Sequence, residues 1–177
     1  MARKAKQKPS KKPSAKKEVL PRWDLTHLYS SPEDAAIASD FRALEKSINY
    51  FTTQYQGKLN AADNLAAAIS AYEKIEDRAG RLASYAQLLY ATAMHDAAVT
   101  QFFQNTQERL TKILSKLVFF TLEINQLDEK KLAAALATNP KLTHYKPWLD
   151  AVRAYKPYQL SHELESYIHE TSVTLDA

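Results

Sequence analysis

Histidine is the residue type of this chain best suited to bind a metal ion, and the chain has five: His27, His95, His144, His162 and His169. A helical zinc site of the His-Glu-x-x-His type needs two histidines four residues apart. Both imidazoles then face the metal, and the glutamate activates a water molecule. No two histidines of this chain have that spacing. The sequence therefore contains no metal site of this type.

The segment from His162 to Glu170 comes closest to such a motif. Its two histidines are seven residues apart, which on a helix is nearly two turns, or about 10 Å along one face. Zinc–nitrogen bonds are about 2.0–2.1 Å long, so His162 and His169 cannot share a zinc ion unless the helix bends. Glu165 and His169 are properly spaced, but such a pair is common by chance. We expect a solvated helix face here.

Other catalytic chemistry is also excluded by composition. The chain has no cysteine and only two glycines, Gly57 and Gly80. Thiol nucleophiles, disulfides, a Gly-x-Ser-x-Gly nucleophile motif and glycine-rich phosphate loops are therefore ruled out. The adjacent acids Glu76-Asp77 lie beside Arg78 and Arg81, which indicates surface ion pairing rather than acid–base catalysis. We expect no catalytic, cofactor-binding or metal-binding residue in this chain.

The same composition predicts an all-α fold. Two glycines are too few for a sheet joined by tight turns, and the long runs of Ala, Leu, Gln, Lys and Glu favour helix. With 177 residues, of which 45% are hydrophobic, the chain can form one domain with a substantial core. We expect a bundle of five to seven helices, with the aromatic residues of the helical stripes in the core.

The first ordered elements are predicted from caps and periodicity. Residues 20–29 are dense in large apolar groups and are expected to form a strap or a single turn over the helices. A helix then begins at Ser31-Pro32, with acids in its first turn, and ends near Gly57. Its apolar stripe has steps of three and four residues: Ile37, Phe41, Leu44, Ile48, Phe51 and Tyr55.

Six more helices are expected further along the chain. Residues 61–79 and 81–94 form two helices that join in a kink at Gly80. Asp96 caps a long helix that reaches about residue 125 and spans roughly 40 Å at the usual rise per residue. Asp128 starts a short helix that ends before Asn139-Pro140, and another covers about residues 145–155. Ser161 caps the last one, with Glu163 and Glu165 in its first turn.

The charge is concentrated at the N-terminus. Residues 1–17 hold eight basic residues and no acid, which leaves 16 basic and 20 acidic residues elsewhere. We assign residues 1–19 to a disordered basic tail and residues 20–177 to a helical domain, because the tail has too little apolar surface to fold. Two alternatives are a weak electrostatic arm for RNA or anionic membranes and a mitochondrial-type presequence, although the tail lacks the apolar face of an amphipathic helix.

Four segments carry a family resemblance: residues 23–29 (WDLTHLY), 81–92 (RLASYAQLLYAT), 117–124 (LVFFTLEI) and 156–165 (KPYQLSHELE). In this order they resemble parts of the oligoendopeptidase F-type enzymes of the M3 metallopeptidase family. These parts are its W-D-L-x-x-L-Y opening, the helix that follows, an aromatic-rich long helix and an R-P-H-x-L-S-x-x-x-E segment. Lys156 and Tyr158 depart from the last pattern. The resemblance covers residues 20–177.

The resemblance implies a helical N-terminal domain that forms one wall of a deep channel. In the family, zinc is bound by His-Glu-x-x-His and a downstream glutamate further along the chain, and the enzyme cleaves short peptides. None of these metal ligands has a counterpart here, so no catalytic or zinc-binding role is transferred, and the chain alone is expected to be inactive. It is either a fragment or a short protein that kept only this domain.

A stand-alone helical interaction or scaffold protein is the alternative hypothesis. A domain without its catalytic partner is expected to expose an apolar face, which could drive self-association. Nucleic-acid binding is expected only weakly, through the basic tail. The sequence has no apolar run long enough for a membrane span and no secretory signal, and it lacks cysteine. A cytoplasmic location is therefore expected.

Overall fold

The computed structural model describes the backbone of residues 23–175, with side chains other than those of residues 162, 166 and 172–175. The predicted tail, residues 1–19, lies outside the described residues, so its disorder and the domain boundary at residue 20 stay predictions. Within the described part of the chain there is no strand. The all-α fold is therefore confirmed.

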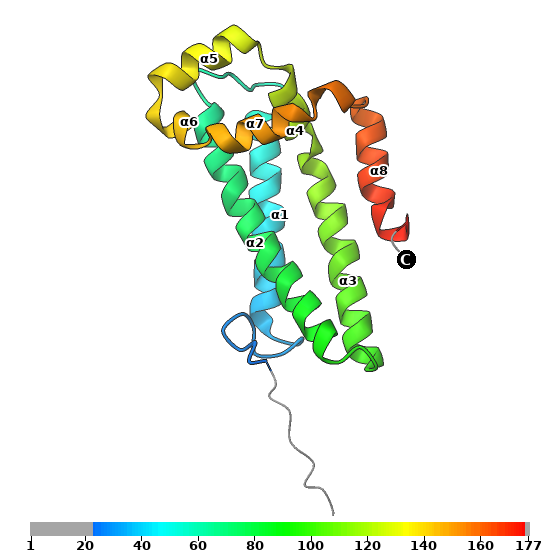
Figure 1. The fold of residues 1–177 in the computed structure, drawn as a ribbon. Coiled ribbons are helices and arrows are strands. Elements are labelled where there is room, and N and C mark those ends of the chain that lie inside the picture. The colour runs from blue at the N-terminus through cyan, green and yellow to red at the C-terminus, as the bar shows by residue number, and fades with distance from the viewer. Residues whose placement is uncertain (1–22, 176–177) are drawn as a thin grey trace, which may run out of the picture.

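Three long helices build the body of the molecule, and shorter ones cover one end. In Figure 1, α1, α2 and α3 run side by side, α5 to α7 lie across one end of them, and α8 returns beside α3. No helix among the described residues is long and apolar enough to cross a membrane. The helical segments are α1 (Ala35–Tyr55), α2 (Leu65–Thr92), α3 (Ala97–Leu114), η1 (Ser115–Leu117), α4 (Val118–Gln126), α5 (Glu129–Thr138), α6 (Pro140–His144), α7 (Lys146–Ala154), η2 (Lys156–Tyr158) and α8 (His162–Leu175).

Helix α1 ends as predicted but begins later. Gly57 has a φ of 71°, a conformation that suits glycine, and the helix stops just before it at Tyr55. The cap is Asp34, not Ser31, because one Asp34 carboxylate oxygen accepts from Ala36 N at 2.9 Å. The other oxygen accepts from Ser30 N at 2.9 Å and holds the preceding residues in a turn. Ser31 Oγ instead accepts from Glu33 N at 3.2 Å within the turn that precedes the helix.

The two helices predicted on either side of Gly80 are one continuous helix. Residues 65–92 form one helix of 28 residues, and Gly80 lies within it. A glycine in a helix costs only about 0.5–1 kcal/mol relative to alanine. Ile75, Ala79 and Leu82 are all buried around this position, and the burial of large side chains such as Ile75 and Leu82 stabilises the helix by more than that cost. Packing against α1 and α3 therefore keeps the helix continuous.

The single long helix predicted from Asp96 to about residue 125 is interrupted. Asp96 is the cap, as expected, with its carboxylate accepting from Ala98 N at 2.9 Å. The 3-10 turn η1 then separates α3 from α4. Ser115 lies at the start of this turn and donates its hydroxyl to Lys112 O at 3.0 Å, a local bond that competes with the regular helix ladder. After this turn, α4 is buried on several sides. Its buried residues are Phe119, Phe120, Leu122, Ile124 and Asn125.

The C-terminal helices follow the predicted caps, with one addition. Asp128 caps α5 and Ser161 Oγ accepts from Leu164 N at 3.4 Å at the start of α8. The sequence prediction missed α6, a five-residue helix that Asn139 caps and Pro140 begins. Asn139 Oδ1 accepts hydrogen bonds from Lys141 N and Leu142 N, and Leu142 is fully buried. Both features stabilise this single turn.

The aromatic residues meet where the long helices reach the short ones. Phe51 of α1 contacts Phe120 of α4 edge-on, with ring centres 5.0 Å apart. Tyr72 of α2 lies 5.0 Å from Phe120 and 5.9 Å from Trp148 of α7. Such pairs add about 0.5–1.5 kcal/mol each beyond simple burial. The prediction that these aromatics belong to the core is confirmed, and they fix the short helices onto the long ones.

Candidate functional site

The histidines are not gathered into a site. His27 lies in the turn before α1, His95 lies between α2 and α3, and His144 ends α6. His162 and His169 both lie on α8, as predicted, and the side chain of His162 is outside the described residues. Among the residues that the structure describes, no group of three His, Cys, Asp or Glu side chains could hold a metal ion.

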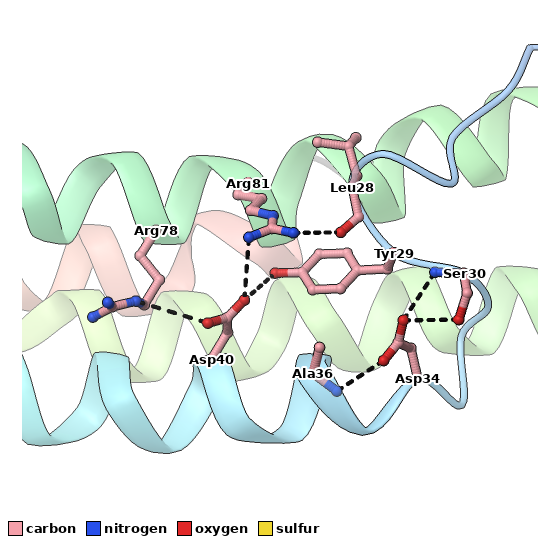
Figure 2. Close-up of polar contacts among 8 residues, drawn as sticks. All are labelled: Leu28, Tyr29, Ser30, Asp34, Ala36, Asp40, Arg78 and Arg81. Carbon is pink, nitrogen blue, oxygen red and sulfur yellow. Dashed lines mark hydrogen bonds and ion pairs between the residues drawn. The ribbon is translucent and has the colours of Figure 1, made fainter.

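Arg78 and Arg81 pair with Asp40 of α1, not with the neighbouring acids Glu76-Asp77 (Figure 2). Arg78 Nε and Arg81 Nη1 each lie 3.9 Å from an Asp40 carboxylate oxygen. Asp77 and Arg81 have the four-residue spacing of a helical ion pair, but the Arg81 side chain lies beside Asp40 instead. The expected surface ion pairing is present, but the acid that takes part comes from another helix.

The Asp40 cluster ties the strap of residues 25–30 to α1 and α2. Tyr29 is buried and donates its hydroxyl to Asp40 Oδ2 at 2.7 Å. Arg81 donates to Leu28 O at 2.6 Å and stacks over the Tyr29 ring at 4.7 Å (Figure 2). Burial, followed by the hydrogen bond to Asp40, raises the pKa of Tyr29 above its ordinary range. These contacts hold the strap against α1 and α2.

A different surface has the features of an interface. Six large apolar side chains of the segment from the end of α7 to α8 face solvent, although such residues are usually buried. We call them the carboxy-terminal apolar surface. They are Tyr155, Tyr158, Leu160, Leu164, Tyr167 and Ile168, with exposed fractions from 44% to 79%.

A hollow of about 430 Å³ lies beside this surface, between α4, α7 and α8. Asn125, Trp148 and Tyr158 are among the side chains that line it. Asn125 is only 5% exposed, and its Oδ1 has no hydrogen-bond partner among the described residues. A buried polar atom normally has a partner, because leaving it unpaired costs about 1–3 kcal/mol. Asn125 is therefore a buried polar residue in the wall of the hollow, with its amide oxygen closed off from solvent.

Arg153 holds α7 against the end of α4 and so shapes this hollow. Its side chain is 10% exposed and donates to Ile124 O at 2.6 Å and to Leu127 O at 3.2 Å. It also forms an ion pair with Glu129, and Lys156 lies 3.6 Å from the same carboxylate. The Arg153 hydrogen bond, followed by its charge, holds the pKa of Glu129 below its ordinary value. One arginine thus satisfies the carbonyls at a helix end and positions the next helix.

Sequence reasoning anticipated an exposed apolar face but did not identify its residues. Leu164 and Ile168 have the four-residue spacing of any helical stripe, so the sequence does not distinguish a buried stripe from an exposed one. Asn125 lies between Ile124 and Gln126 at the end of α4, and nothing in this local sequence marks it as a buried polar group. Arg153 gave no signal, because its partners lie more than twenty residues away along the chain.

Comparisons with known proteins point to one family. The protein-family model described as Oligopeptidase F matches residues 123–177. Oligopeptidase PepF of Bacillus subtilis (strain 168) is 27% identical over 158 residues, which cover 86% of this chain and 22% of that protein. The chain thus spans about a fifth of the length of this relative. No solved structure matches the chain. The resemblance expected from the four sequence segments is confirmed.

Proposed function

Because the chain resembles the N-terminal domain of the oligopeptidase F family, we propose that it is the channel-wall domain of a zinc-dependent peptidase that cleaves short peptides. In this proposal the domain packs against a catalytic part and limits access to short, unfolded substrates. The catalytic part supplies the zinc ligands and the chemistry.

One observation carries the proposal. The family model matches residues 123–177, and this range contains the whole carboxy-terminal apolar surface and most of the residues that line the hollow beside it. Large apolar side chains that face solvent on one segment are a common feature of an uncovered interface. The part of the chain that most resembles a peptidase is therefore also the part with the features of an interface.

The residues of this chain do not fit a zinc site. His162 and His169 are seven residues apart, and the sequence has no His-Glu-x-x-His. No step of peptide hydrolysis is therefore assigned to any residue here. The contribution of this domain is to shape and enclose the path of the substrate, which can favour a productive orientation without contact to the reacting atoms.

The first test is the coding sequence beyond codon 177. We expect a His-Glu-x-x-His motif downstream, either in the same reading frame or in an adjacent one. A polypeptide with both parts is expected to hydrolyse a quenched oligopeptide and to lose this activity to a metal chelator. The chain of 177 residues, with added zinc, is expected to give no turnover. Chelator-sensitive turnover by the short chain, or no downstream motif in any frame, would overturn the proposal.

A stand-alone interaction protein is the second candidate, and the carboxy-terminal apolar surface is the observation that favours it. In that case the surface would be covered by a second copy or by another protein. Sedimentation of the purified chain tests self-association. A well-behaved monomer at all concentrations would count against a second copy as the partner that covers this surface. A cytoplasmic location is part of both proposals, and fractionation of the cells that produce the protein tests it.

A further inference from the structure

A second concave surface lies between α1, α2 and the start of α6. Its volume is about 800 Å³, within the range of about 300–1,000 Å³ that is usual for ligand sites. Apolar side chains form much of its lining, including Phe51, Ala66, Ala71 and Ile75, and the exposed ring of Tyr50 stands at its edge. We call it the α1–α2 groove. It shares no lining residue with the hollow beside α8.

Positive charges from three helices meet at this groove. Lys46 comes from α1, Lys74 and Arg78 from α2, and Lys141 from α6, whereas Asp63 is the one acidic residue that lines it. Arg78 is partly neutralised by Asp40, 3.9 Å away. The lysines remain as charges of one sign around a concave surface, an arrangement that attracts anions.

These lysines are not used inside the fold. Lys46, Lys74 and Lys141 form no side-chain ion pair or hydrogen bond with another described residue, whereas Arg109, Lys146 and Arg153 each have an acidic partner. The nearby acid Glu73 accepts a hydrogen bond from Tyr145 at 2.9 Å. The groove therefore keeps its positive charge available for a ligand.

We propose that the α1–α2 groove binds a short acidic peptide. Carboxylates of such a peptide pair with Lys46, Lys74 and Lys141, and its apolar side chains lie on the floor around Ile75 and Ala71. The floor favours a peptide over a bare phosphate or a sugar–phosphate chain, because those ligands would leave the apolar lining in contact with water. The proposal concerns residues of this chain alone and does not depend on the peptidase function.

Titration calorimetry at low ionic strength tests the proposal, with the full chain and the pentapeptide Ac-Glu-Leu-Glu-Phe-Glu-NH2. We expect a dissociation constant of about 1 mM or lower. Binding should weaken at high salt, because the contacts are charged and accessible to solvent. The glutamine analogue, Ac-Gln-Leu-Gln-Phe-Gln-NH2, is expected to bind at least about tenfold more weakly.

The matched variants decide whether the groove is the site. The triple change Lys46→Gln/Lys74→Gln/Lys141→Gln is expected to weaken binding at least about tenfold. The control triple, Lys112→Gln/Lys130→Gln/Lys131→Gln, removes the same charge from exposed lysines outside the groove. It is expected to leave the dissociation constant within about twofold. Thermal unfolding checks that both triples are folded; if the first is not, the three single groove variants replace it.

Four outcomes would overturn the proposal. The first is no binding of the pentapeptide up to about 1 mM. The second is equal binding of the glutamine analogue. The third is that both triple variants bind the pentapeptide equally weakly, or both as tightly as the unaltered chain. Such a result would indicate that the peptide is attracted to the positive charge of the whole chain, including its basic tail. The fourth is tighter binding of a single-stranded oligouridylate through the same lysines, which would assign the groove to nucleic acid.

Discussion

At the scale of single residues, Asp40 is the acid whose contacts bear most on stability. Its carboxylate is 24% exposed, accepts from the buried Tyr29 hydroxyl and lies near two arginines. We predict that Asp40→Ala lowers the free energy of unfolding by about 2 kcal/mol, because it leaves the Tyr29 hydroxyl buried without its partner. Urea unfolding of the variant measures this loss.

Tyr29→Phe completes a double-mutant cycle for the same hydrogen bond. We predict a loss of about 1 kcal/mol for Tyr29→Phe alone. In the background of Asp40→Ala the same change should cost little, because its partner is already gone, and the coupling should reach about 1 kcal/mol. Simple additivity of the two losses would show that the Tyr29–Asp40 contact does not contribute to stability.

Buried tyrosines also set the behaviour of the fold at high pH. Burial raises the pKa values of Tyr29, Tyr72 and Tyr85. A group whose folded pKa exceeds its unfolded value, near 10 for tyrosine, stabilises the fold below that value and loses this effect as the pH rises through the folded pKa. We predict a falling free energy of unfolding above about pH 10.

Urea unfolding at about pH 9 and about pH 11 measures this dependence on tyrosine ionisation. Tyr72→Phe should reduce the loss between the two pH values, because it removes one of the three groups. Tyr158→Phe is the matched control, since Tyr158 is 79% exposed, and should leave the loss unchanged. An identical loss in Tyr72→Phe and in the unaltered chain would contradict the prediction.

At the scale of elements, the two glycines have opposite roles. Gly80 lies inside α2, and a Cβ there would meet no atom within 4 Å. We predict that Gly80→Ala raises the free energy of unfolding by about 0.5–1 kcal/mol through helix propensity and a less flexible unfolded chain. Thermal and urea unfolding measure the gain.

Gly57→Ala is the control for that gain. Gly57 has a φ of 71°, so a Cβ is strained there even though the space around it is open. We predict a loss of about 1 kcal/mol, the lower end of the usual cost of this conformation for other residues. A loss at Gly80 as large as that at Gly57 would mean that α2 bends at Gly80.

The joint between α4 and α7 depends on Arg153. We predict that Arg153→Ala costs about 2 kcal/mol, since it removes charged hydrogen bonds to Ile124 O and Leu127 O at a nearly buried position. Lys146→Ala, on the same helix, removes an exposed pair with Asp150 and should cost at most about 0.5 kcal/mol. Equal losses in chemical unfolding would show that the Arg153 contacts are no stronger than a surface ion pair.

At the scale of the whole molecule, substitutions on the carboxy-terminal apolar surface can separate the stability of the domain from its proposed role beside a catalytic part. Leu164 and Ile168 are 47% and 44% exposed. We predict that Leu164→Ser/Ile168→Ser changes the unfolding of this chain by about 1 kcal/mol or less. In a polypeptide that also carries the catalytic part, the same change should reduce hydrolysis of a quenched oligopeptide at least about tenfold, because it disrupts the interface.

The control for that variant uses another exposed position of the same kind. Met94 is 58% exposed and lies in the turn between α2 and α3. Met94→Ser should leave the hydrolysis of the same oligopeptide unchanged. Full activity of the Leu164→Ser/Ile168→Ser polypeptide would exclude this surface as the contact with the catalytic part.

Much of the fold was determined by the sequence alone, because its signals are local. Caps at Asp96, Asp128 and Ser161, the stop at Gly57 and the apolar stripe of α1 each depend on residues a few positions apart. The absence of a His-Glu-x-x-His motif is likewise a property of spacing within one segment. The family resemblance also came from short segments that can be compared without a structure.

Only the tertiary structure decided the features that join distant segments. The continuity of α2 through Gly80 follows from its packing against α1 and α3, which outweighs the low helix propensity of glycine. The same holds for the α1–α2 groove, whose lysines come from three helices and form no stripe in the sequence. The sequence determined most helix ends and the absence of a His-Glu-x-x-His motif. Packing decided which of the described surfaces remain open, because exposure depends on what every other helix covers.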